Sequence, residues 1–274
     1  MQLVSRGCSN PGAGNTSCIA QVDDTNAPPV VDGTTTVITT LGMVRALPVA
    51  PKATLTAGTT ITATAPGELQ VSNADFTTGL TAHAGGGLNA APSSRFVGPA
   101  GTGSDGRIDT DATLAGLAAQ GADPWFRALF VLDAGSYQRQ PAVVRLDCAA
   151  GCNRARIAAA LVLNPRNPIW ANGDVNLDAA AGGVVDDLGT AANPMMLIVN
   201  GNLTISGDAI IYGFAHANQI TWSAPATTWH GALVSATSFT ATTVATLRYD
   251  KAVLDTIRLG YGSFVRAPGG WNLF

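Results

Sequence analysis

Charged side chains are scarce in this chain of 274 residues, of which they make up 12%, against roughly 25% in an ordinary soluble domain. Uncharged residues such as Thr, Ser, Asn and Gly must therefore cover much of the surface, as is common in secreted and cell-surface proteins. Lys and Arg number 15, Asp and Glu number 18, and no basic stripe is present. This balance argues against a nucleic-acid partner.

Long apolar runs are also missing. No segment reaches the ~20 apolar residues that a membrane-spanning helix needs, and no basic segment followed by an apolar run marks a secretory signal. The chain is nevertheless 46% hydrophobic. At this length, that is enough to bury a core without a dense framework of disulfides.

The four cysteines fall in two close pairs, Cys8 with Cys18 and Cys148 with Cys152. Pairing within each pair closes the smallest loops, so we predict two local disulfides. A metal site or reduced thiols are the alternatives, although a site made of Cys alone favours C-x-x-C spacing. Disulfides indicate an extracytoplasmic location, such as the periplasm or the cell surface. We therefore expect a targeting or anchoring segment upstream of Met1.

Familiar catalytic motifs are absent: no Gly-x-Ser-x-Gly elbow, phosphate-binding loop or paired-histidine metal motif occurs. Three carboxylates lie close together at Asp105, Asp109 and Asp111, and a loop of oxygen ligands is what Ca²⁺ prefers. The order of an EF-hand is missing, and helix capping and turn formation explain the cluster more simply. We predict no cofactor, with Ca²⁺ at these residues as the open alternative.

A second catalytic alternative is a polysaccharide-cutting β-helix enzyme, which places carboxylates along one exposed strand face. The candidates lie at turn-like positions beside Gly or Asn instead: Asp174, Asp178, Asp186, Asp187 and Asp208. We therefore predict that the protein is not an enzyme and has no catalytic residues.

Short β patterns dominate both ends of the chain. Residues 34–40 are largely β-branched, and 59–63 and 69–72 alternate apolar with polar positions. From residue 157 onward the β pattern returns, and the continuous apolar run 195–199 indicates a strand buried on both faces. Asn-Gly pairs also fit hairpins, but the short strands and irregular spacing favour stacked coils. The predicted fold class is mainly β, similar to a parallel β-helix.

A few short helices interrupt the strands. We predict them at 111–120, capped by Thr110 or Asp111, at 124–130, and at 249–258, where Asp250 can cap the first turn. A further short helical segment is expected near the start of the chain.

Three regions follow from these patterns, although they also fit one continuous domain. Residues 1–84 form a β-rich region with a cystine loop, and 85–156 form a loop and helical insertion. Residues 157–274 form a β-helix-like region, which a helix and an apolar tail would cap at its open end.

The end of the chain carries specific motifs. Residues 229–235 (Trp-His-Gly-Ala-Leu-Val-Ser), 247–254 (Leu-Arg-Tyr-Asp-Lys-Ala-Val-Leu) and 262–271 (Gly-Ser-Phe-Val-Arg-Ala-Pro-Gly-Gly-Trp) resemble the C-terminal pattern of PilX-type type IV pilus assembly proteins. The pattern departs at Gly270, where the family usually has Ser. The resemblance extends over about 50–274 and includes the Cys148/Cys152 pair.

This resemblance implies a minor pilin: a head anchored by an N-terminal hydrophobic helix, here absent, which works with other pilus subunits or a tip adhesin. It brings no catalytic residues. The alternative function is a cell-surface adhesin or a carbohydrate-binding β-helix module, in which Trp222 and Trp229 would stack on sugars.

Overall fold

The computed structural model describes residues 2–9, 33–64, 66–99, 106–179 and 187–273. They belong to two compact units. The smaller unit holds 1–44 and 264–274, and the larger holds 45–263.

The smaller unit is a three-stranded sheet in the order β1-β2-β19. Strand β1 (Gln2–Ser9) runs antiparallel to β2 (Gly33–Arg45), whose Thr-rich segment has the expected β conformation. The helical segment expected near the start of the chain is wrong, because β1 occupies it. The expected apolar tail is also a strand, β19 (Gly262–Leu273), since its backbone pairs within this sheet.

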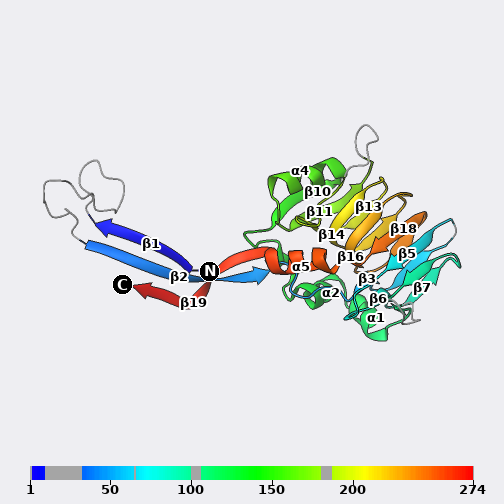
Figure 1. Ribbon diagram of the computed structural model, residues 1–274, viewed down its shortest axis with the longest axis horizontal. Helices are drawn as coiled ribbons and strands as arrows, with labels where there is room; N and C mark the ends of the chain where they lie inside the picture. Colours follow the sequence, from blue (N-terminus) through cyan, green and yellow to red (C-terminus); the bar gives the residue numbers. More distant parts are fainter. Residues whose placement is uncertain (1, 10–32, 65, 100–105, 180–186, 274) are drawn as a thin grey trace. The chain divides into compact units, whose positions relative to one another are not determined.

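The larger unit is a stack of parallel coils (Figure 1), which confirms the mainly β, parallel β-helix-like fold. Its strands form one sheet of sixteen that bends around three faces. The first face, called here the helix-covered sheet, contains β10 (Val144–Asn153), β11 (Ile169–Leu177), β12 (Met195–Val199), β14 (Ile210–Ala217), β16 (Thr228–Ser235), β3 (Ala53–Ala57), β6 (Leu80–Ala84) and β9 (Arg107–Ile108).

The second face, called the polar sheet, continues from the end of β11 through β13 (Asn202–Ile205), β15 (Gln219–Trp222), β17 (Phe239–Ala241), β4 (Thr60–Ala63) and β7 (Gly87–Ala90). The third face contains the first residues of β14 and β16, followed by β18 (Val244–Arg248), β5 (Glu68–Ser72) and β8 (Arg95–Val97).

The coils do not stack in chain order. Strand β16 pairs with β3, so that Leu233 lies opposite Leu55, and the coils of 53–108 follow the coil of 231–248. The chain then returns through 109–143 to begin the other end of the stack at β10. This return segment is helical and covers the outside of one sheet.

The described residues of the larger unit contain five helices: α1 (Ala112–Ala119), α2 (Ala122–Phe130), α3 (Ala134–Tyr137), α4 (Arg154–Leu163) and α5 (Lys251–Gly260). Three were expected, whereas α4 replaces the β structure expected from residue 157. Within the described residues, no helix is long and apolar enough to cross a membrane.

Two of the expected helix caps are present. The Asp111 carboxylate accepts hydrogen bonds from the backbone N–H groups of Thr113 and Leu114, and Asp250 accepts one from Val253. The expected position of the last helix is wrong, because α5 packs along β14 and β16 instead of closing an end of the stack. At the β10 end, α4 packs on β10 and β11 (Figure 1).

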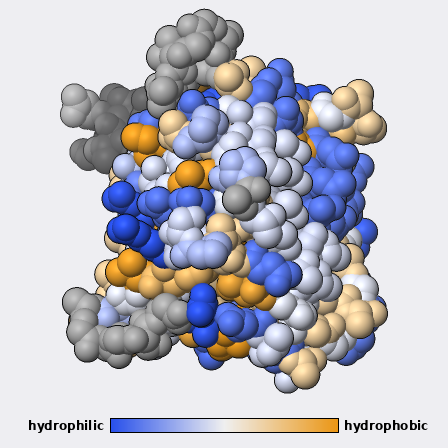
Figure 2. Space-filling model, turned by 90° about the vertical axis from the view of Figure 1, so that its right-hand side faces the viewer, coloured by the Kyte–Doolittle hydropathy of each residue, from blue (hydrophilic) through white to orange (hydrophobic). Residues whose placement is uncertain are grey.

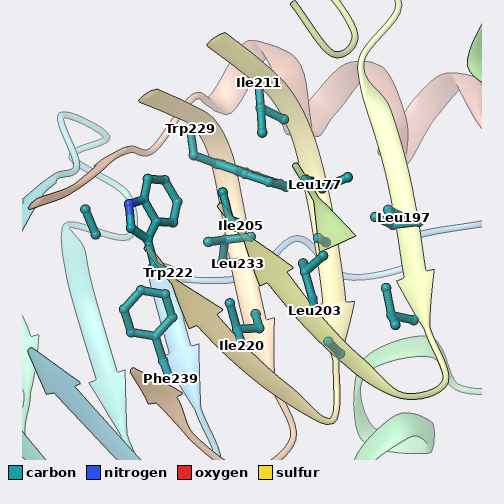
Figure 3. Close-up of a cluster of buried hydrophobic side chains, with 14 of the residues drawn as sticks. Leu177, Leu197, Leu203, Ile205, Ile211, Ile220, Trp222, Trp229, Leu233 and Phe239 are labelled. Carbon is teal, nitrogen blue, oxygen red and sulfur yellow. The ribbon is translucent and has the colours of Figure 1, made fainter. Parts of the chain in front are cut away.

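The inner core fills the coils. Inward residues of successive strands lie opposite one another in ladders, for example Leu203, Ile220 and Phe239 of the polar sheet. In Figure 3 the side chains from different strands point toward one another. Polar-sheet strands therefore alternate buried and exposed residues, because only one of their faces is covered.

A second core lies outside the helix-covered sheet. Phe126 and Phe130 of α2 and Leu254 of α5 pack on outward residues such as Phe214 and Ile198. Strand β12 is consequently buried at every position, as its continuous apolar sequence predicts.

The regions expected from the sequence differ from these units. The boundaries expected at 84/85 and 156/157 both fall inside the larger unit. Ladders join its early and late strands, since β3 pairs with β16 and β4 with β17.

Glycine at 231 is required by the stacking. Its φ is +133°, and a Cβ there would lie 1.9 Å from the backbone oxygen of Gly213 on the next coil. We expect Gly231→Ala to lower the free energy of unfolding by about 3 kcal/mol or more. Gly116→Ala in α1, where a Cβ meets nothing within 4 Å, should instead raise it by about 0.5–1 kcal/mol. Denaturant unfolding of both variants checks this, and equal effects would contradict the close-stacking account.

Candidate functional site

The carboxylates considered for Ca²⁺ have structural partners where they are described. Asp111 caps α1 and lies 2.8 Å from His83 Nε2, and Asp109 pairs with Arg107 at 3.5 Å. Asp105 lies outside the described residues. In the described ranges, no group of three or more His, Cys, Asp or Glu side chains is placed to hold a metal ion.

The two tryptophans considered for sugar stacking are buried inside the coils. Trp222 donates its indole N–H to the backbone oxygens of Ala224 and Val244, and Trp229 donates to Gly213. Both have 0% exposed surface. Their assignment as surface binding residues is therefore wrong, because an indole that fills the core has no face free for a ligand.

The aspartates considered for polysaccharide cleavage hold the turns between faces. Asp174 accepts a hydrogen bond from the backbone of Asn202, Asp178 from Arg154, and Asp208 from Ala226. Each bond joins neighbouring coils, so these carboxylates align the stack. Asp186 lies outside the described residues, and Asp187 is exposed.

One predicted disulfide is present in the first coil, between Cys148 and Cys152 of β10. It closes the bulge where the register of β10 against β11 shifts. The disulfide fits an oxidising, extracytoplasmic environment. The pairing of Cys8 with Cys18 lies outside the described residues and stays a prediction.

The polar sheet carries a ladder of outward amide and hydroxyl side chains, one from each strand. Neighbouring strands lie about 4.8 Å apart, so the ladder repeats at that spacing along the stack. Its members are Asn153, Asn176, Thr204, Thr221, Thr240, Thr62 and Asn89. Figure 2 views the side of the larger unit around β5 and β7 and shows white, pale-blue and strongly blue areas with separate orange patches.

The sequence contains a signal for this ladder that a search for a fixed period misses. Six of its seven members stand in an apolar–Asn/Thr–apolar tripeptide, as in Leu203-Thr-Ile, Ile220-Thr-Trp and Phe239-Thr-Ala, whereas Asn153 precedes an arginine. The intervals between these tripeptides vary because the turns differ in length. Aligning the tripeptides themselves would have predicted which residues form the ladder.

A cavity of about 210 Å³ lies between α1, α2 and the helix-covered sheet. His83 and Thr56, which are opposite each other on β6 and β3, line it together with Trp125. The hydrogen bond with His83 lowers the pKa of Asp111, which therefore stays ionised at neutral pH. The remaining walls are largely apolar, so the cavity suits an apolar group with one or two polar atoms.

A smaller cavity of about 120 Å³ lies where α2 and α3 meet the corner between the helix-covered and polar sheets. Trp170 and His216 line it, and both are buried. His216 also packs edge-on against Phe126 and Phe130, with ring centroids 5.6 and 5.7 Å away. This burial lowers the pKa of His216 to about 4, so the imidazole is neutral at neutral pH.

The C-terminal motifs specify how the last coil joins α5 and β19. Asp250 caps α5, Tyr261 donates its hydroxyl hydrogen to the backbone oxygen of Pro194, and Ser263 accepts from the backbone of Ala142. The next two residues, Phe264 and Val265, are instead 54% and 42% exposed. The motif therefore contains two buried residues with hydrogen bonds, Tyr261 and Ser263, followed directly by an exposed apolar pair.

No protein-family model matches this sequence, and no curated protein shows significant similarity to it.

The disulfide of the first coil should contribute modestly to stability, because its loop is short. We expect Cys148→Ala/Cys152→Ala to lose about 2 kcal/mol of unfolding free energy. Peptide mapping without reductant should recover the 148–152 cross-link, and separately a fragment joining Cys8 to Cys18. Free thiols at either pair in unreduced protein would contradict that pairing.

The free energy of unfolding should decrease as the pH is lowered, because of His216. The unfolded chain takes up its proton near pH 6.5, whereas the folded protein does so only at about pH 4, so this contribution is lost as pH falls between these values. We expect a loss of about 3 kcal/mol across this interval. His216→Phe keeps the aromatic packing and should not show this pH-dependent loss. Carboxylates are common to both proteins, so their contributions cancel in the difference between the two unfolding free energies. Parallel pH profiles of the two unfolding free energies would disprove this.

Proposed function

We propose that this chain is a non-catalytic structural component of a type IV pilus system, acting as an exported, pilin-like head that contacts other pilus subunits. The observation that carries the proposal is the division of the C-terminal motif. Its Asp250 and Ser263 are hydrogen-bonded inside the larger unit, whereas Phe264 and Val265 expose apolar surface. Apolar residues that a motif exposes are candidates for contact with a partner.

Two further features support the proposal. The Cys148–Cys152 disulfide fits a protein that works outside the cytoplasm. In the stacked coils, three carboxylates accept backbone hydrogen bonds from neighbouring coils and so have a structural role. The hydrophobic helix expected upstream would anchor this head in the membrane before assembly and belongs to the same proposal.

A second candidate is a cell-surface adhesin or carbohydrate-binding module. The ladder of the polar sheet favours it, because regularly spaced hydroxyl and amide groups can exchange hydrogen bonds with a polyhydroxylated surface. A glycan array probed with the protein would detect that activity, and loss of the signal in Thr204→Val/Thr221→Val would assign it to the ladder.

The pilus proposal is tested in the source bacterium by immunoblotting sheared pili for this chain. We expect it in the pilus fraction, and we expect Phe264→Ser/Val265→Ser to reduce its incorporation at least about tenfold, a loss of 1.4 kcal/mol in contact energy. The matched control is Val162→Ser/Leu163→Ser on α4, where the two side chains are 80% and 78% exposed.

The control should be incorporated normally, since it makes the same chemical change elsewhere. Both variants should have the melting temperature of the wild type. Absence of the chain from pili, or equal losses for the two variants, would refute the proposal.

A further inference from the structure

The last strand of the smaller unit, β19, lies at an edge of its sheet. The strand order is β1-β2-β19, and in the described residues no strand pairs with the outer side of β19. The strand is 12 residues long. An open edge of this kind presents a row of backbone N–H and C=O groups on which another strand can pair, and proteins usually keep such edges short, charged or covered.

The exposed apolar pair lies in the first half of this edge strand. Successive side chains of a strand point to opposite faces of the sheet, so Phe264 and Val265 lie on different faces. They are 54% and 42% exposed, so neither face is covered at this point. A flat partner surface would cover only one of the two side chains. A strand added to the edge would cover both, because its own side chains continue both faces of the sheet.

Pro268 indicates which backbone groups face the open edge. A proline inside a strand has no N–H, and it fits an edge strand where that group would face away from the sheet. The hydrogen-bonding direction alternates along a strand. The backbone groups of Phe264 and Arg266 therefore face the open edge as well, and each of these residues offers one N–H and one C=O to an added strand.

A second copy of the chain supplies a strand with matching properties. A two-fold axis places the same edge strand antiparallel to itself. When the axis passes at Val265, midway between the start of the strand at Gly262 and Pro268, Phe264 exchanges backbone hydrogen bonds with Arg266 of the second copy. The two Val265 side chains then lie opposite each other on one face. On the other face Phe264 lies opposite Arg266, where a cation–π contact is favourable.

We propose that two copies of this chain associate through β19, which joins the three strands of each copy into one continuous sheet. The inference deepens the proposed function, on which it rests for the role of Phe264 and Val265, by naming a second copy as the partner of that surface. A sheet of three strands is close to the minimum for stability, and pairing extends it. Because the paired segment is short, the dissociation constant should be on the order of 10 µM to 1 mM.

The test is sedimentation equilibrium of the purified whole chain from about 5 µM to about 1 mM. We expect the mean mass to rise from 27.8 kDa toward twice this value. Val265→Lys and Val265→Asp should each weaken association at least about tenfold, because each places like charges directly opposite each other. An equimolar mixture of the two variants should regain at least the association of the wild type, since opposite charges then face each other.

Two further measurements locate the contact. The matched control variants are Leu163→Lys and Leu163→Asp on α4, where the side chain is 78% exposed, and neither should change association. Hydrogen exchange at the amides of Phe264 and Arg266 should slow as the concentration of the wild type rises, because strand pairing covers these N–H groups.

Three results overturn the proposal: a wild type that stays monomeric over the whole range, an equimolar mixture that associates as weakly as its components, and a dimer in which the amides of Phe264 and Arg266 exchange at an unchanged rate. These measurements need no pilus. Absence of the chain from pili would therefore refute the proposed function alone, whereas a monomeric wild type would overturn only the pairing through β19.

Discussion

The pairing of β16 with β3 is the constraint on which the larger unit depends. It joins the last coil of the chain's second half to the first coil of its first half, with Leu233 opposite Leu55. Once these strands are neighbours, the chain must travel from β9 back to β10 along the outside of the stack. The return segment can bury its own apolar residues only against one sheet, and this creates the second core. The non-sequential strand order therefore requires the return segment that forms the helical cover.

Much of the architecture could be predicted because stacked coils leave local signals. Alternation marks strands with one covered face, and the uninterrupted apolar run of β12 marks the sheet covered on both. Helix caps such as Asp111 and Asp250 are also local. Helix α4 was missed because its Ala, Val, Leu and Ile content suits either structure. The register of β3 on β16 could not be predicted, because a contact across that many residues has no signature in the sequence between.

Candidate binding residues were harder to predict than strands. Trp222 and Trp229 look available for a ligand in the sequence, yet inward and outward positions on a short strand differ by one residue. Carboxylates beside Gly or Asn look like a catalytic set, yet turns between coils need acceptors for backbone N–H groups. In a β-helix, polar residues at corners are therefore weak indicators of chemistry.

Polar residues in the middle of the helix-covered sheet are stronger indicators of chemistry, because each can be compared with the residues at equivalent positions of the neighbouring strands. One outward row contains Trp170, Ile198, His216, Val234, Thr56 and His83, all at equivalent positions. An apolar residue suits each position, since helices or the return segment cover this face. Every member of the row lies beside one of the two cavities, Trp170, Ile198 and His216 at the smaller and Val234, Thr56 and His83 at the larger. The row therefore places three hydrogen-bonding side chains, His216, Thr56 and His83, under a cover against which an apolar residue would pack as well.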